Sequence, residues 1–182
     1  MQEIEVPLES AHEEIHKAAH EAGGWLRYAA LASALLAALA AVAALMAGHF
    51  ANEAMLEQIK AGDHWSFYQA KSIKASLVDA RLDMLPPGAA AEARAKLTAK
   101  SSDYKREQKE IEEQAGELER ESQAHLQLHQ TFARAVTFFQ VAIAIAAIAV
   151  LARRRRYFGV ALAFGGVGLA FMVQALVELK LF

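Results

Sequence analysis

The sequence has no cysteine and few residues that break helices. Without cysteine there is no disulfide, no thiolate metal site, no iron–sulfur cluster and no cysteine nucleophile. Only three prolines and ten glycines occur among the 182 residues, so long, uninterrupted helices are expected. The strongest breaker is the run Pro86-Pro87-Gly88, which predicts one sharp turn near the middle of the chain.

A strong net charge and known catalytic motifs are also lacking. The formal net charge is only −2, which gives no reason to expect a nucleic-acid partner. The sequence contains no P-loop, no Gly-rich dinucleotide turn, no nucleophile elbow and no HExxH motif. We therefore expect that the protein is not an enzyme and that it does not bind nucleic acid.

What the sequence does contain is three long apolar blocks, at residues 25–48, 132–152 and 157–177. A helix needs ~20 apolar residues to cross the hydrocarbon core of a bilayer, and in lipid a helix satisfies its own backbone groups. The first block is too long for a signal-peptide core and follows an acidic segment, so we expect an uncleaved anchor. The sequence thus predicts an all-α membrane protein with three transmembrane helices.

Four consecutive arginines predict the orientation of these helices. Arg153, Arg154, Arg155 and Arg156 form the short loop between the second and third blocks, and positive charge in short loops stays in the cytoplasm. We therefore expect residues 1–24 and 153–156 to be cytoplasmic. Residues 49–131 and the tail at 178–182 then lie outside the cytoplasm, which in a bacterium means the periplasm.

Residues 49–131 are predicted to form a long antiparallel helical hairpin with its turn at 86–88. Apolar residues recur every seven positions on both arms, which is typical of a coiled coil. The predicted seam consists of Leu56, Ile59, Ile73 and Leu77 on the first arm and Leu97, Tyr104, Ile111 and Leu118 on the second. Gly62 is expected to interrupt the first arm, because glycine costs ~1 kcal/mol relative to alanine inside a helix.

Two groups of histidines are candidate metal ligands. His12, His16 and His20 recur every four residues in a predicted amphipathic helix that ends at Gly23-Gly24, and imidazoles on neighbouring turns can share a transition metal ion. The alternative is a solvated helix face that titrates with pH.

The second group depends on how the hairpin folds. If the two arms fold about Pro87, His49 lies opposite His125, and His129 lies one turn further along. Metal binding or pH sensing is one interpretation, and a polar collar at the membrane surface is the other. The same count places Trp65 and its aromatic neighbours opposite Arg106 and Lys109, where cation–π packing is expected.

Small residues in the apolar blocks favour close packing of helices. Alanine fills much of the first block, and the third contains Gly165, Gly166 and Gly168. Small side chains let helix backbones approach each other in lipid. We therefore expect a tight bundle and a homo-oligomer.

The stretch of residues 49–77 with its flanks resembles a bacterial family of membrane proteins, the domain-of-unknown-function family 4337. The resemblance covers nearly the whole chain, and it is most specific between Asn52 and Lys74. It implies a topology and a bacterial origin, but no mechanism. It also implies a functional surface on the first arm, whose candidate residues are Asn52, Asp63, Trp65, Tyr68, Gln69, Lys71 and Lys74.

These features favour a non-enzymatic, homo-oligomeric inner-membrane scaffold. Its spans contact membrane lipid, and its exposed hairpins pair with those of further copies and bind an envelope protein. One alternative is a channel or transport subunit in which oligomerised first helices line a pore. The other is a metal or pH sensor that uses the histidines described above.

Overall fold

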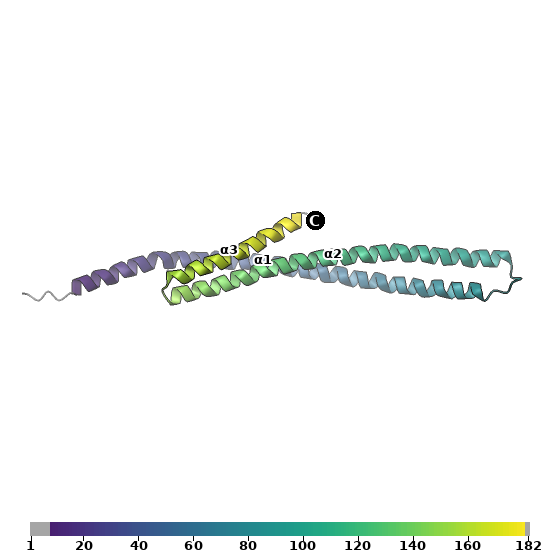
Figure 1. The fold of residues 1–182 in the computed structure, drawn as a ribbon, viewed down its shortest axis with the longest axis horizontal. Helices are drawn as coiled ribbons and strands as arrows, with labels where there is room; N and C mark the ends of the chain where they lie inside the picture. The colour runs from purple at the N-terminus through teal and green to yellow at the C-terminus, as the bar shows by residue number, and fades with distance from the viewer. Residues whose placement is uncertain (1–7, 181–182) are drawn as a thin grey trace, which may run out of the picture. The chain divides into compact units, whose positions relative to one another are not determined.

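The computed structural model describes residues 8–180, with side chains from residue 24 onward. This part of the chain contains three helices and no strand: α1 (Leu8–Asp83), α2 (Ala91–Leu151) and α3 (Arg155–Lys180) (Figure 1). Each of the three helices is long and apolar enough to cross a membrane. The predicted all-helical fold is therefore confirmed.

Helix α1 is longer than the sequence suggested. It continues for 76 residues through Gly23-Gly24 and through Gly62, so both expected interruptions are wrong. A single glycine costs only ~1 kcal/mol in a helix, and good helix formers flank all three positions. The propensity of the neighbouring residues and the packing of the helix therefore outweigh the local cost.

The connection between α1 and α2 contains the two prolines. Hydrogen bonds between residues three apart follow α1. The Leu85 amide donates to the Leu82 carbonyl (3.2 Å) and the Ala89 amide donates to the Pro86 carbonyl (2.9 Å). Proline lacks the amide hydrogen that would continue the helix. Residues 91–96, the first turn and a half of α2, are exposed, so this part of α2 extends beyond the packed seam.

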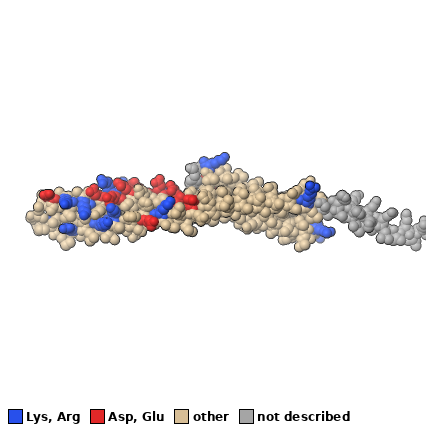
Figure 2. Space-filling view, turned by 180° about the vertical axis from the view of Figure 1, so that it is seen from behind, with Lys and Arg blue, Asp and Glu red and all other residues tan. Residues whose placement is uncertain are grey.

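The chain divides into two compact units. We call the first the bundle unit; it contains the chain up to Gly48 and from Leu128 onward. The second, the hairpin unit, is His49–Gln127. On the face drawn in Figure 2, charged side chains gather over the hairpin unit, and the long middle stretch of the bundle unit shows none.

The core of the bundle unit combines a few large side chains with many alanines. The largest fully buried side chains are Phe132, Phe139 and Leu128. Helix α3 packs through glycines, since a Cβ atom added at Gly165 would lie 2.9 Å from Leu36 Cδ2, and one at Gly168 would lie 2.8 Å from Phe139 Cδ1. Glycine at 168 therefore allows close helix approach, since the Phe139 ring and the Ala135 carbonyl oxygen leave no room for a side chain, whereas at 165 only the end of the Leu36 side chain would have to move.

One end of the bundle unit is aromatic and basic. The rings of Trp25 and Phe158 lie 6.4 Å apart, and the Arg156 guanidinium lies 5.3 Å from the centre of the Tyr157 ring. Arg153 has a left-handed backbone (φ 50°) in the turn between α2 and α3, a conformation common just after a helix end. The four arginines predicted to set the topology thus lie together at this turn.

Candidate functional site

The seam between α1 and α2 in the hairpin unit is built from small residues. On α1 the buried apolar residues include Ala54, Ala61 and Ala75, and on α2 the buried residues include Ser101, Ala115 and Ser122. Several of these positions are separated by seven residues or a multiple of seven. Small side chains let the two helices approach closely, so that polar groups reach across from one arm to the other.

A buried carboxylate and an imidazole occupy the same seam. Glu57 is only 8% exposed, and its Oε2 lies 2.9 Å from His125 Nδ1. The His125 ring stacks on Phe50, with centroids 5.7 Å apart. The buried Ser122 hydroxyl donates a 2.8 Å hydrogen bond to the Ala54 carbonyl. Burial of the carboxylate is therefore offset by a charge-assisted contact when His125 is protonated.

Trp65 links the two arms closer to the turn than Glu57 and His125 do. Its indole Nε1–H donates a 2.8 Å hydrogen bond to Glu119 Oε1. The Tyr68 ring meets the Trp65 ring edge-on, with centroids 5.5 Å apart and an interplanar angle of 74°. Both aromatic side chains are half-buried, and a Trp N–H normally finds such a partner when it is removed from water.

Lys71 makes the next cross-arm contact. It forms an ion pair with Glu107, and its ammonium lies 5.4 Å from the centre of the Tyr104 ring. Lys100 approaches the same ring at 5.9 Å. Tyr104 is therefore the aromatic residue that receives cation–π contacts in the hairpin unit.

The expected pairing of Arg106 and Lys109 with the Trp65 aromatic group is wrong. Arg106 forms ion pairs with Asp103 (3.4 Å) and Glu110 (3.9 Å) on its own helix. Lys109 likewise lies 4.0 Å from Glu113. Both cations are exposed, so these contacts contribute little to stability.

Asp79 and Ser101 form the cross-arm contact nearest the turn. The Ser101 hydroxyl donates a hydrogen bond of 2.5 Å to Asp79 Oδ1, and Lys105 Nζ lies 2.9 Å from Asp79 Oδ2. The Ser101 hydrogen bond, with a further hydrogen bond and positive charge from Lys105, lowers the pKa of the Asp79 carboxyl. Both partners favour the charged form of the carboxyl group.

The two arms are not paired as the sequence count expected. His125 meets Glu57 and Phe50, whereas the exposed His49 contacts its own neighbour Phe50, with centroids 5.1 Å apart. The predicted pairing of His49 with His125 is wrong because His49 is exposed and its neighbour Phe50 lies against His125 instead. Contacts closer to the turn, such as Ser101 with Asp79 and Trp65 with Glu119, are shifted from a count centred on Pro87.

The predicted metal ligands are not brought together. Among the residues whose side chains are described, no three His, Asp or Glu residues could hold a metal ion. His129, in the bundle unit, donates from Nδ1–H to the Ala47 carbonyl at 2.8 Å. The side chains of His12, His16 and His20 lie outside the described residues, so that prediction is untested.

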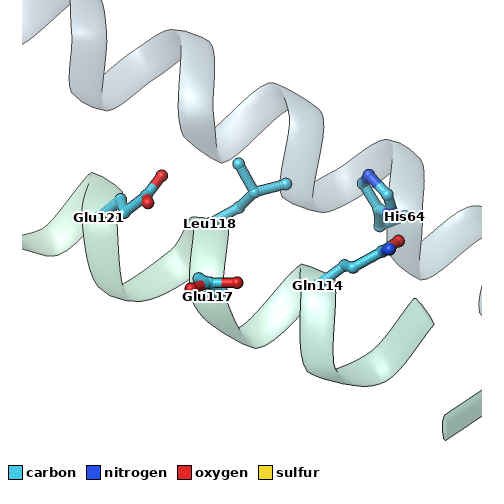
Figure 3. A pocket seen from close by; sticks show the side chains of 5 residues that line it. All are labelled: His64, Gln114, Glu117, Leu118 and Glu121. Carbon is cyan, nitrogen blue, oxygen red and sulfur yellow. The ribbon is translucent and has the colours of Figure 1, made fainter. Parts of the chain in front are cut away.

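A shallow hollow of about 330 Å³ lies along the hairpin unit. Figure 3 shows His64 on α1 leaning toward Gln114 on α2, with Leu118 between the helices. Glu117 and Glu121 line the same hollow. It is an open groove between two helices, not an enclosed pocket of the kind that buries most of a small ligand.

The residues predicted to form the seam are placed differently on the two arms. Leu97, Tyr104, Ile111 and Leu118 are half-buried. The four residues of the first arm, by contrast, are 46% to 66% exposed: Leu56, Ile59, Ile73 and Leu77. They lie on the side of α1 away from the buried alanines, so they do not hold the hairpin together. Their role in an oligomer remains a prediction.

The predicted partner surface is divided between two faces of α1. Trp65, Tyr68 and Lys71 contact α2, as described above. The other members are exposed, namely Asn52, Asp63, Gln69 and Lys74. Glu57 and Glu119 were not predicted as seam residues from the sequence. The alanines at 54, 61 and 75, separated by multiples of seven, were the signal that locates the seam on α1.

Comparison with known proteins identifies one similarity. The family model described as "Domain of unknown function (DUF4337)" matches residues 25–178. This range includes the side chains of the bundle and hairpin units discussed above. No curated protein and no solved structure matches the chain.

Proposed function

The chain belongs to the DUF4337 family, and from this premise we propose that it is a non-enzymatic, homo-oligomeric scaffold of a bacterial inner membrane. In this proposal α1, α2 and α3 each cross the bilayer, and the hairpin unit forms a coiled coil in the periplasm. One observation carries the proposal: Leu56, Ile59, Ile73 and Leu77 form an apolar stripe that the chain itself leaves exposed. In water such a stripe favours association.

The arrangement of charges supports the proposed orientation. Two of the four arginines lie in the first turn of α3, where cations are disfavoured by the helix dipole. A role in topology explains this local cost, because positive charge keeps short loops in the cytoplasm. Trp25 and Tyr157 at the same end fit the aromatic belt of a membrane interface.

The mass of the purified protein in detergent tests whether the chain forms a homo-oligomer. The full chain in mild detergent at micromolar concentration is expected to be a stable oligomer by native mass spectrometry, without added ligand. Replacement of Ile73 by lysine should lower the oligomeric mass, because it buries a charge in the stripe. Replacement of the exposed Ser102 on α2 by lysine is the matched control. A wild-type monomer contradicts the proposal.

Labelling tests the orientation separately. Because the chain has no cysteine, each single-cysteine variant carries one reactive thiol. A membrane-impermeant maleimide added to spheroplasts should label G88C, whose position is open on all sides. It should label A152C only after the membrane is permeabilised. The reverse pattern contradicts a periplasmic hairpin.

A further inference from the structure

Helix α1 carries a second seven-residue repeat on its outward side. It consists of every seventh residue from Tyr28 to Leu77 and every seventh residue from Leu31 to Ala80, with Met84 just past the end of the helix, and we call it the outer stripe. Its polar members are His49, Asn52, Asp63 and Ser66. Every one of these positions is exposed. The large apolar members are 46% to 77% exposed. The repeat is counted along the sequence and is present in the bundle unit and in the hairpin unit, each considered by itself.

We propose that the outer stripe is the surface on which a second copy of this chain docks, with the two α1 helices parallel and the same residues level with each other. This inference rests on the proposed membrane scaffold and specifies its interface. A repeat of seven keeps one side of a supercoiled helix facing its partner. The partner must therefore be a helix that follows α1 along its length.

Few helices can meet that requirement. The partner needs an apolar stretch beside residues 28–48 and a water-compatible stretch beside residues 49–84. Helix α1 of a second copy has both. The α2 helix of a second copy fits less well, because the large apolar residues of its hairpin part are half-buried in its own seam except Leu126. The outward side of α2 carries charges such as Glu110 and Glu113 instead.

The charges beside the stripe favour the parallel arrangement. Lys60, Lys74 and Arg81 flank one edge, and Gly62, Gln69 and Ser76 flank the other. In a parallel pair, opposite edges of the two stripes face each other, so cations meet uncharged residues. An antiparallel pair along the whole stripe would instead place these cations beside the partner's residues 31–52, most of them apolar, where an unpaired charge is costly.

Asn52 can fix how the two α1 helices align along their length. It lies within the stripe and is exposed in the single chain. An amide side chain is both donor and acceptor, so it can pair with its own copy across a two-fold axis. An asparagine at such a position fixes alignment and helix number at some cost in stability. It is one of four polar positions in the stripe, and Asp63, level with its own copy in a parallel pair, adds a further cost.

The size of the stripe suits a stable dimer. At ~1.5 Å per residue, its two parts together measure roughly 85 Å, and with a helix width of ~10 Å they offer roughly 850 Å² per copy. Specific protein interfaces bury about 800 Å² per partner. The outer stripe therefore reaches the usual size without help from α2 or α3.

Disulfide formation between single-cysteine variants tests the interface in membranes that contain the full chain. L77C lies in the stripe, and the control S102C is also exposed but lies on α2. After oxidation with copper phenanthroline, L77C should give at least tenfold more covalent dimer than S102C. Both substitutions are at exposed sites, so folding should be retained, and circular dichroism checks this.

The possible results distinguish a wrong α1 interface from a wrong scaffold proposal. The wild-type mass in mild detergent is measured in parallel. An oligomer in which S102C cross-links as well as L77C, or in which L77C gives no dimer, overturns the α1 interface and leaves the scaffold standing. A monomeric wild type overturns both.

Discussion

At the scale of single residues, the hairpin unit is held by polar side chains that reach across a seam of small residues. Asp79 is the clearest case, because the Ser101 hydroxyl and the Lys105 ammonium both bind its carboxylate. Each contact favours the ionised form. The pKa of Asp79 in the folded chain is therefore below its ordinary value.

This lowered pKa gives a prediction for pH dependence. Because the folded-state pKa is below the unfolded one, the contact contributes stability above pH ~4. That contribution is lost as the pH falls through the folded-state pKa. Replacing Ser101 with alanine should raise the pKa of Asp79 toward 3.8, measured by carbon-detected NMR titration of the side chain.

Ser102 offers the matched control for this titration. Its hydroxyl bonds the Ala99 carbonyl on its own helix, so its replacement by alanine should leave the pKa of Asp79 unchanged. An equal response to both substitutions would show that the Ser101 hydrogen bond is not the main cause of the lowered pKa.

The residue scale also shows why the two arms differ in how far the site could be predicted. Tyr104, Ile111 and Leu118 are half-buried, and their large apolar side chains make the repeat of seven conspicuous in the sequence. On the other arm the large apolar residues, such as Ile73 and Leu77, lie outside the seam and are exposed. The true seam there contains Ala61 and Ala75, whose small size made the repeat weak in the sequence.

At the scale of elements, α3 depends on glycine where it meets the other helices of the bundle unit. A Cβ atom at Gly168 would lie 2.8 Å from Phe139 Cδ1 and 3.2 Å from the Ala135 carbonyl oxygen. Both neighbours are fully buried. Neither the backbone nor the packed ring has room to move without disturbing the core.

Replacing Gly168 with alanine should therefore destabilise the bundle. Overpacking of this kind typically costs about 1–3 kcal/mol, which outweighs the ~1 kcal/mol that alanine gains in helix propensity. Unfolding in mixed detergent and sodium dodecyl sulfate, followed by circular dichroism, measures the change. Gly166 has nothing within 4 Å of an added Cβ, so its replacement by alanine should be neutral or stabilising.

The number and type of the elements were predictable, but their lengths were not, because α1 continues through both expected interruptions. The three apolar blocks and the turn at Pro86-Pro87 correspond to α1, α2, α3 and the connection between the first two. The pairing of the arms was not predictable, because it depends on where α2 begins relative to the end of α1. The six exposed residues that start α2 bear no sequence mark that distinguishes them from packed ones.

At the scale of the whole molecule, the proposed topology depends on the four arginines at 153–156. Replacing all four with glutamine should produce chains of mixed orientation, because the bias that holds the short loop in the cytoplasm is removed. The fraction of G88C labelled in spheroplasts should then fall well below that of the parent variant. Long exported segments tolerate charge, so glutamine at Arg94, Lys96 and Lys100 should leave the labelled fraction unchanged.

The segment that joins α1 to α2 has a practical consequence. From Met84 to Lys96 no side chain is fully buried, and an added side chain at Gly88 would meet nothing within 4 Å. Exposed tips of this kind accept foreign sequence. A fluorescent domain or an affinity handle spliced in after Gly88 should leave every cross-arm contact intact, so the chain can be tracked and captured through its own turn.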